Sequence, residues 1–223
     1  MVRQSRRRPR DPRWSTLLTV LVVLSGGPLS AAAQPAAEKE EGFVPLFNGK
    51  DLTGWEGDAK LWLVEDGLLI GRSPGINHND FLATTRTYRD FVLRFDVRLV
   101  NGQGNSGVQF RSKRVPPPSH EVSGYQADIA PGYWGKLYDE SRRNRVLAGA
   151  EAEIKKALRP KDWNQYEVQA IGNKITMRLN GVTTVDYTEP DAGMAAEGII
   201  ATQIHGGGPM EVQFRNIRLK ALP

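Results

Sequence analysis

Apolar and polar residues alternate along most of the chain after residue 42. The clearest example is residues 90–100, where every second residue from Phe91 to Leu99 is apolar and the intervening positions are mostly polar or charged. A period of two predicts a strand with one face in the core and the other mostly in water. Residues 174–180 repeat the pattern, and Asn180-Gly181 predicts a hairpin turn into a returning strand at 182–187.

Shorter runs of the same kind predict further strands, at 61–65, 68–72, 81–84, 107–111, 125–129, 163–171 and 198–205. Near residue 215 the apolar positions change parity at Arg215-Asn216, which fits either a β-bulge or a misread register. Residues 151–158 alone have a helical pattern, which ends before Pro160. We therefore expect an all-β fold, an antiparallel β-sandwich or jelly roll with one short helix, and we expect Trp55, Trp62 and Trp163 in its core.

The first 33 residues resemble a targeting segment. They contain six arginines up to Arg13, then an uncharged apolar stretch at 14–24, and then three alanines at 31–33 that fit a cleavage site. We assign 1–33 to a signal peptide, 34–42 to a polar linker and 43–223 to one domain. The alternative is an uncleaved N-terminal anchor, although the apolar stretch is shorter than the roughly 20 residues of a membrane span.

Charge and cysteine content add to the expectation of export that comes from the N-terminal segment. Six of the 30 Lys and Arg residues and one of the 25 acidic residues lie in 1–33, so the rest of the chain carries 24 of each. A net charge of zero gives no basic footprint for nucleic acid. The chain has no cysteine, so its core alone must hold it. These features are typical of a bacterial periplasmic or extracellular domain, with no membrane contact after signal cleavage.

One segment matches a nucleotide-binding motif, but the residues around it do not fit a nucleotide site. Residues 102–107 match the glycine pattern G-x-G-x-x-G. A dinucleotide site needs a helix directly after this pattern, whereas here another strand follows. We interpret the segment as a turn between antiparallel strands.

Polar side chains recur at a spacing of two on three predicted strands, which puts each pair on one side of its sheet. If the three strands are neighbours, the polar side chains share one surface that suits a polyhydroxylated ligand. Four nearby aromatic residues can stack on sugar rings, although they also fit a core, and polar residues on an outer face are ordinary. The pairs are Gln109 and Arg111, Gln126 and Asp128, and Gln203 and His205; the aromatic residues are Tyr125, Tyr133, Trp134 and Tyr138.

Several segments in order resemble the 3-keto-disaccharide hydrolase domain family. The resemblance spans about residues 43–219. It includes the opening FNGKDLTGW at 47–55, DFVLRF at 90–95, GNSGV at 104–108 with Asn105, GYQADI at 124–129, and the closing FRNI at 214–217. The resemblance implies a concanavalin-A-like jelly roll, export, and cleavage of glycosides already oxidised to a ketone at sugar carbon 3. The long loop at 131–159 departs from the family pattern, so the particular sugar is not carried over.

The resemblance implies chemistry that starts at carbon 2, whose proton the neighbouring ketone makes acidic. A base removes this proton, the group on carbon 1 leaves, and water adds back, so the enzyme is either a hydrolase or a lyase and hydratase acting on 3-keto-sugars. We expect His205 or Asp128 as the base and Arg111 as the stabiliser of the enolate. A divalent cation held by Glu121, Asp128 or His205 is the alternative stabiliser.

The expected substrate-binding residues are Gln109, Gln126, Gln203, Asn105, Tyr125, Trp134 and Tyr138. A second hypothesis from another class is a non-catalytic, lectin-like carbohydrate-binding domain on the same fold. A third is an adhesion domain without a ligand, which scattered polar pairs would favour. The paired-carboxylate motif E-x-D-x-x-E of retaining glucanases is missing from the sequence.

Overall fold

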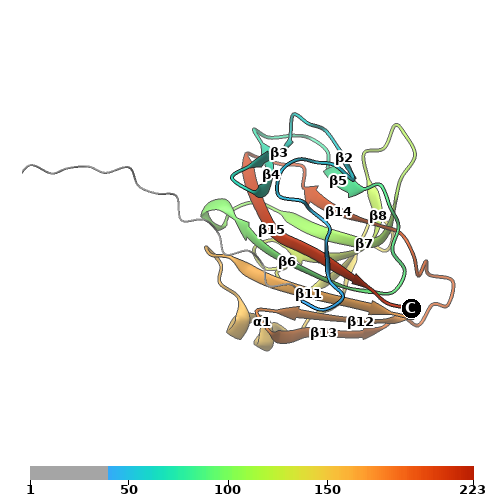
Figure 1. Ribbon diagram of the computed structural model, residues 1–223. Coiled ribbons are helices and arrows are strands. Elements are labelled where there is room, and N and C mark those ends of the chain that lie inside the picture. Colours follow the sequence, from blue (N-terminus) through green and yellow to red (C-terminus); the bar gives the residue numbers. More distant parts are fainter. Residues whose placement is uncertain (1–39) are drawn as a thin grey trace, which may run out of the picture. The chain divides into compact units, whose positions relative to one another are not determined.

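The computed structural model describes residues 40–223, which form two facing antiparallel sheets (Figure 1). The predicted signal peptide, 1–33, lies outside the described residues, as does most of the linker. The first sheet has the order β13 (Val182–Thr188), β12 (Lys174–Leu179), β11 (Asn164–Ile171), β6 (Phe91–Leu99), β15 (Met210–Ala221), β4 (Leu68–Ser73) and β3 (Trp62–Glu65), and β1 (Val44–Pro45) pairs with β15. The predicted all-β sandwich is confirmed.

The second sheet has the order β10 (Arg145–Ala148), β9 (Leu137–Glu140), β8 (Val122–Ile129), β7 (Ser106–Arg114), β14 (Ile199–Ile204), β5 (Asp80–Thr84) and β2 (Trp55–Glu56). The predicted helix is present as α1 (Glu151–Ala157), and a short 3-10 turn, η1 (Val100–Gly102), follows β6. Strands β1, β2, β9 and β10 were not predicted, because two to four residues carry too little alternation to recognise. No helix of the described chain has both the length and the apolar character needed to cross a bilayer.

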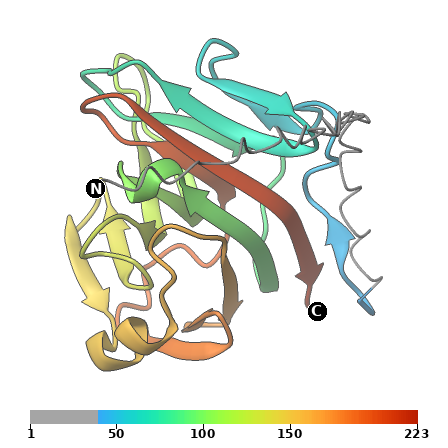
Figure 2. The same ribbon diagram turned by 90° about the vertical axis from the view of Figure 1, so that its left-hand side faces the viewer.

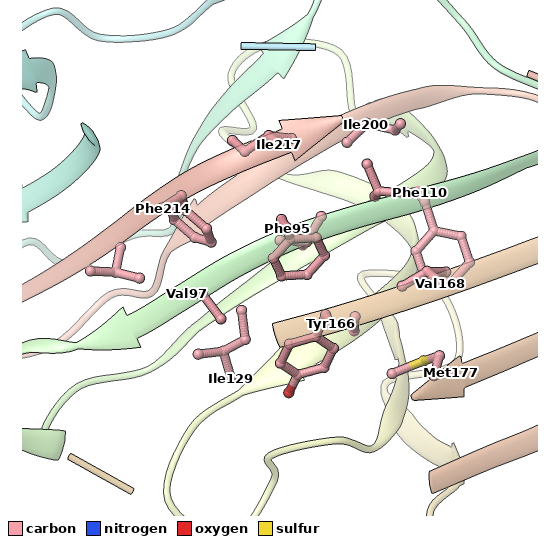
Figure 3. Packing of buried hydrophobic residues seen from close by; sticks show 14 of the residues in the cluster. Phe95, Val97, Phe110, Ile129, Tyr166, Val168, Met177, Ile200, Phe214 and Ile217 are labelled. Atoms are coloured by element: carbon pink, nitrogen blue, oxygen red, sulfur yellow. The ribbon is translucent and has the colours of Figure 1, made fainter. Parts of the chain in front are cut away.

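Alternation sends one face of each sheet into a common core. Along β6, buried residues from Phe91 to Leu99 alternate with half-buried ones, as the sequence predicts. Figure 3 shows Phe95, Phe214 and Tyr166 together in this core, where the rings of Phe95 and Tyr166 stack with centroids 5.1 Å apart. Side-by-side pairing of β15 with β6 runs almost the whole length of both strands (Figure 2), and it shifts register between Arg215 and Arg218. The parity change is therefore a bulge.

Tyr166 connects the two sheets through the core. It belongs to β11 of the first sheet and is fully buried. Its hydroxyl donates to the main-chain carbonyl of Asp128 on β8, at 2.7 Å, and accepts from the Gly135 N–H, at 2.8 Å. A polar handle on a buried aromatic ring normally finds partners in this way. This contact fixes the end of β8 and the loop that follows it.

Two expectations about local structure were wrong. The segment 102–107 is not a turn between paired strands, because β6 and β7 lie in different sheets and the segment carries the chain from one to the other. Trp163 does not join Trp55 and Trp62 in the core. It precedes β11 at an outward position, where the guanidinium groups of Arg98 and Arg215 lie over its ring, at 4.7 and 4.2 Å from the centroid.

Candidate functional site

Three of the predicted polar residues share one face of the second sheet. Strand β7 lies between β8 and β14, with Gln109 opposite Gln126 on one side and opposite Ala201 on the other. Gln203 follows Ala201 by two residues, so its side chain is on this same face. The face points away from the sandwich core, yet the three glutamines are at most 2% exposed. They form a buried polar floor rather than the wet surface that the alternation predicted.

A pocket of about 200 Å³ opens beside this floor. Side chains of β8 and β9 line it, together with residues at the ends of β7 and β14 and in the loop after β8. The lining residues are Asn105, Gln126, Asp128, Tyr133, Tyr138, Glu140 and His205. All of them except Glu140 belong to the residues that the sequence singled out.

Two carboxyl groups in this pocket have raised pKa values. Burial, followed by the nearby Glu140 carboxylate, raises the pKa of Asp128 to about 7. Burial, followed by the Glu121 carboxylate, also raises the pKa of Glu140, against the opposing effect of His205. Glu140 was missed because β9 is only four residues long. Its spacing of two from Tyr138, next to buried Leu137 and Asp139, is the signal that could have found it.

A chain of carboxamides supports these carboxyl groups from below. Gln109 Nε2 donates to Gln126 Oε1 at 3.4 Å, and Gln126 Nε2 donates to Glu140 Oε2 at 3.4 Å. The Gln126 side chain lies flat over Gly107, where any Cβ would overlap its carboxamide. Glycine at this position therefore makes room for the chain of hydrogen bonds.

His205 presents one ring nitrogen for proton transfer. Its Nδ1 lies 2.7 Å from the Gly206 carbonyl oxygen, and its backbone N–H donates to the Asn105 carbonyl at 3.1 Å. A carbonyl oxygen can only accept, so in this geometry Nδ1 carries a proton and Nε2 is left to exchange one. His205 lines the same pocket as Asp128 and Glu140.

Arg111 does not join the pocket, contrary to expectation. Its backbone φ is +49°, and the register of β7 shifts between Phe110 and Lys113, so a bulge turns its side chain away from the glutamine face. The buried guanidinium binds Asp90 Oδ1 at 2.6 Å and the carbonyls of Arg89 and Gly172. Arg111 is placed to hold loops together rather than to stabilise an enolate.

Two of the predicted aromatic residues lie in the core. Tyr125 and Trp134 are 2% and 3% exposed, and they pack inside the sandwich. Tyr125 alternates with Gln126 along β8, so the same rule that turns Gln126 outward turns Tyr125 inward. Its hydroxyl donates to Glu189 at 2.7 Å. Of the aromatic residues, Tyr133 and Tyr138 are left to contact a ligand.

The residues considered as metal ligands do not form a set. Glu121 accepts from Asn79 Nδ2 at 3.0 Å and from Ser141 Oγ at 2.7 Å, and it does not line the pocket of Asp128 and His205. Within 40–223 no three His, Cys, Asp or Glu side chains are grouped to hold a metal ion. The residues in this part of the chain therefore do not fit a divalent cation.

Comparison with known proteins gives the family. Residues 42–220 match the model of the 3-keto-alpha-glucoside-1,2-lyase-like domain. The chain belongs to this family. This result confirms the resemblance seen in the sequence, and the match covers nearly all of the described residues.

Three similar proteins have names connected with carbohydrates. A 3-keto-disaccharide hydrolase of Bacteroides thetaiotaomicron is 23% identical over 82% of this chain and 79% of its own. A candidate glycosyl hydrolase from Parabacteroides distasonis superposes with a TM-score of 0.62 at 23% identity, over 82% of this chain and 95% of its own. The carbohydrate-binding module CBM66 from Bacillus subtilis gives a TM-score of 0.57 at 19% identity, over 75% and 96%. The two structures show that the sandwich is shared.

Proposed function

We propose that the protein cleaves 3-keto-glycosides, including 3-keto-disaccharides, by removing the proton on carbon 2, eliminating the group on carbon 1 and adding water. The observation that carries this proposal is the pocket in which Asp128, Glu140 and His205 meet, two of them with raised carboxyl pKa values. Perturbed groups that converge in a pocket are typical of acid–base sites. Family membership supports a sugar substrate.

Asp128 acts as the base in this scheme. A pKa of about 7 leaves a substantial fraction ionised at neutral pH and makes the carboxylate a stronger base than an exposed aspartate. It takes the carbon-2 proton, and the electron pair moves to the ketone oxygen. The resulting enolate returns this pair, which breaks the bond between carbon 1 and the leaving oxygen and gives an enone.

His205 and Tyr138 handle the two oxygen atoms. In its doubly protonated form His205 gives the Nε2 proton to the leaving oxygen, and the neutral ring then takes a proton from the water that adds at carbon 1. Asp128 returns its proton to carbon 2, which restores both groups. Burial and then the nearby carboxylates raise the pKa of Tyr138, so its hydroxyl stays protonated and can donate to the enolate oxygen. Tyr138, with Asn105, takes over the role that the sequence suggested for Arg111.

Incubation with matched substrates tests the proposal. The purified protein should release a keto-monosaccharide from 3-keto-disaccharides and leave the unoxidised parents intact. In deuterated water, it should exchange the carbon-2 proton of a 3-keto-glycoside, as followed by NMR. Asp128→Asn should lose both activities, whereas Asp186→Asn, an exposed carboxylate change on β13, should keep them.

Two results would contradict the proposed activity. Cleavage of the unoxidised parents at a similar rate would exclude chemistry that depends on the ketone. Sugar binding without exchange or cleavage of any keto-glycoside would favour the lectin-like alternative.

A further inference from the structure

A second pocket lies on the same side of the second sheet, next to the first. It has a volume of about 330 Å³ and is bounded by the loop that joins β7 to β8. Phe81 of β5 forms part of its floor, opposite Gln203 in the register of the sheet. The rest of the lining includes charged groups and the apolar faces of a proline run, among them Asp58, Arg114, Pro116, Pro117 and Glu121. Such a mixture suits a sugar ring, which has both polar edges and apolar faces.

Gln203 lines neither pocket, but it lies between Phe81 of the second and Glu140 of the first. It is fully buried, and it is near enough to the Glu140 carboxyl to lower the pKa of that group, against the effect of burial. Yet no atom of residues 40–223 lies within 3.5 Å of its Nε2 or Oε1 in hydrogen-bonding geometry, so Glu140 is at most a long contact. The Oε1 atom of neighbouring Gln109 also has no hydrogen-bond partner in this part of the chain. A buried carboxamide without partners destabilises the folded state. In a binding site this loss of stability is explained, because a bound ligand supplies the missing hydrogen-bond partners.

The Glu121 side chain crosses over the floor formed by the three glutamines. Glu121 accepts from Asn79, just before β5, and from Ser141, just after β9, so it bridges two strands that lie on either side of Gln203. Asn79 Oδ1 in turn accepts from the Gly206 N–H, next to His205. The ring of His120 stacks on His78 with centroids 4.0 Å apart. The loop is thus held over the floor by a few polar and stacking contacts rather than by a core.

We propose that the second pocket is the subsite for the leaving group of the substrate, and that it joins the first when Glu121 releases Asn79. The keto-sugar ring occupies the first pocket beside Asp128, and the second sugar ring of a disaccharide lies against Phe81 and the loop. Hydroxyls of the second ring then bind the Gln203 carboxamide. This proposal rests on the proposed function, since it assigns the two halves of the same substrate.

Gln203→Met tests the subsite because it keeps the side-chain volume and removes the unpaired amide. Activity is compared on a 3-keto-disaccharide and on the corresponding methyl 3-keto-glycoside, whose leaving group is too small to reach the second pocket. The variant should lower kcat/KM for the disaccharide on the order of tenfold more than for the methyl glycoside, the effect of one hydrogen bond to a buried group. Its unfolding midpoint should rise.

Thr184→Val is the matched control. Thr184 is buried on β13 of the other sheet, and its hydroxyl also has no partner within the described chain. Its replacement should raise the unfolding midpoint and leave the ratio between the two substrates unchanged. Equal effects of Gln203→Met on both substrates, or no effect on either, would overturn the subsite.

A calorimetric experiment separates this proposal from the proposed function. The 3-keto-disaccharide and the methyl glycoside are titrated into Asp128→Asn, with and without Gln203→Met. Selective loss of affinity for the disaccharide supports the subsite even when no turnover is detected. Equal affinities of both ligands for both forms would exclude it even if the enzyme proves active.

Discussion

Replacing Asp128 by Asn should remove activity and, above neutral pH, stabilise the fold. Asn has nearly the same shape and does not ionise. In the folded protein Asp128 is 5% exposed, and burial, with Glu140 second, raises the pKa of its carboxyl to about 7. An ionised Asp128 is therefore a source of instability, which the substitution takes away.

The direction with pH follows from proton binding. The unfolded chain ionises Asp128 near its ordinary pKa of 3.8, while the folded chain keeps the proton up to about 7. Between these values the folded state binds more protons, so stability falls as the pH rises and is constant again above the folded pKa. The whole difference corresponds to about 4 kcal/mol, of which between about 2 and 3 kcal/mol falls between about pH 5 and about pH 8.5.

Urea unfolding, followed by circular dichroism across this pH range, measures the effect. The wild-type free energy of unfolding should fall with pH relative to that of Asp128→Asn; the gap should widen from about pH 5 and become constant above about pH 7. Asp186→Asn should follow the wild type, because this carboxyl group is exposed. If the wild-type and Asp128→Asn curves run parallel, the carboxyl group of Asp128 is not buried as an acid, and its role as a poised base fails with it.

Three further changes test other parts of the site. Glu140→Gln removes the second cause of the raised pKa of Asp128, so the acidic limb of the kcat/KM profile against pH should move to lower pH. An unchanged limb would show that the charge of Glu140 does not affect the pKa of Asp128. Gly107→Ala should displace the Gln126 carboxamide and lower kcat more than tenfold, about 1.4 kcal/mol or more in barrier, and normal kcat would show that the Gln126 side chain moves without consequence. Arg111→Met should cost about 3–5 kcal/mol in urea unfolding, because it breaks a buried ion pair, while the KM of the remaining folded protein stays the same; a KM effect would return Arg111 to the site.

Alternation carried the sequence analysis furthest where strands are long. The nine residues of β6 and the hairpin of β12 and β13 were predicted within two residues of their ends, because a period of two is unmistakable over that length. The same rule put Gln109, Gln126 and Gln203 on the side of their strands that faces away from the core, where the structure has them. It could not say that β7, β8 and β14 are neighbours, since strand order depends on contacts far apart in the chain.

The errors in the site have local physical causes. At Arg111 a bulge with positive φ breaks the period, and a non-glycine residue gives no warning of it. Tyr125 was placed with the ligand for being aromatic, although its position in the alternation already turned it toward the core. Glu140 was missed because a four-residue strand looks like a loop. The sequence pattern therefore predicted which sheet face carries the site. The residues that line the pocket depend on short strands and bulges, which the pattern does not show.

Through Tyr166, the position of Asp128 depends on the opposite sheet. One hydroxyl from the first sheet holds the main chain beneath this carboxyl group and also anchors the loop that carries Tyr133. If the two sheets move apart slightly, Asp128 is displaced before the hydrogen bonds between strands break. Heat inactivation should therefore precede or coincide with the loss of near-ultraviolet circular dichroism. The rate of turnover would then report on the packing between the two sheets.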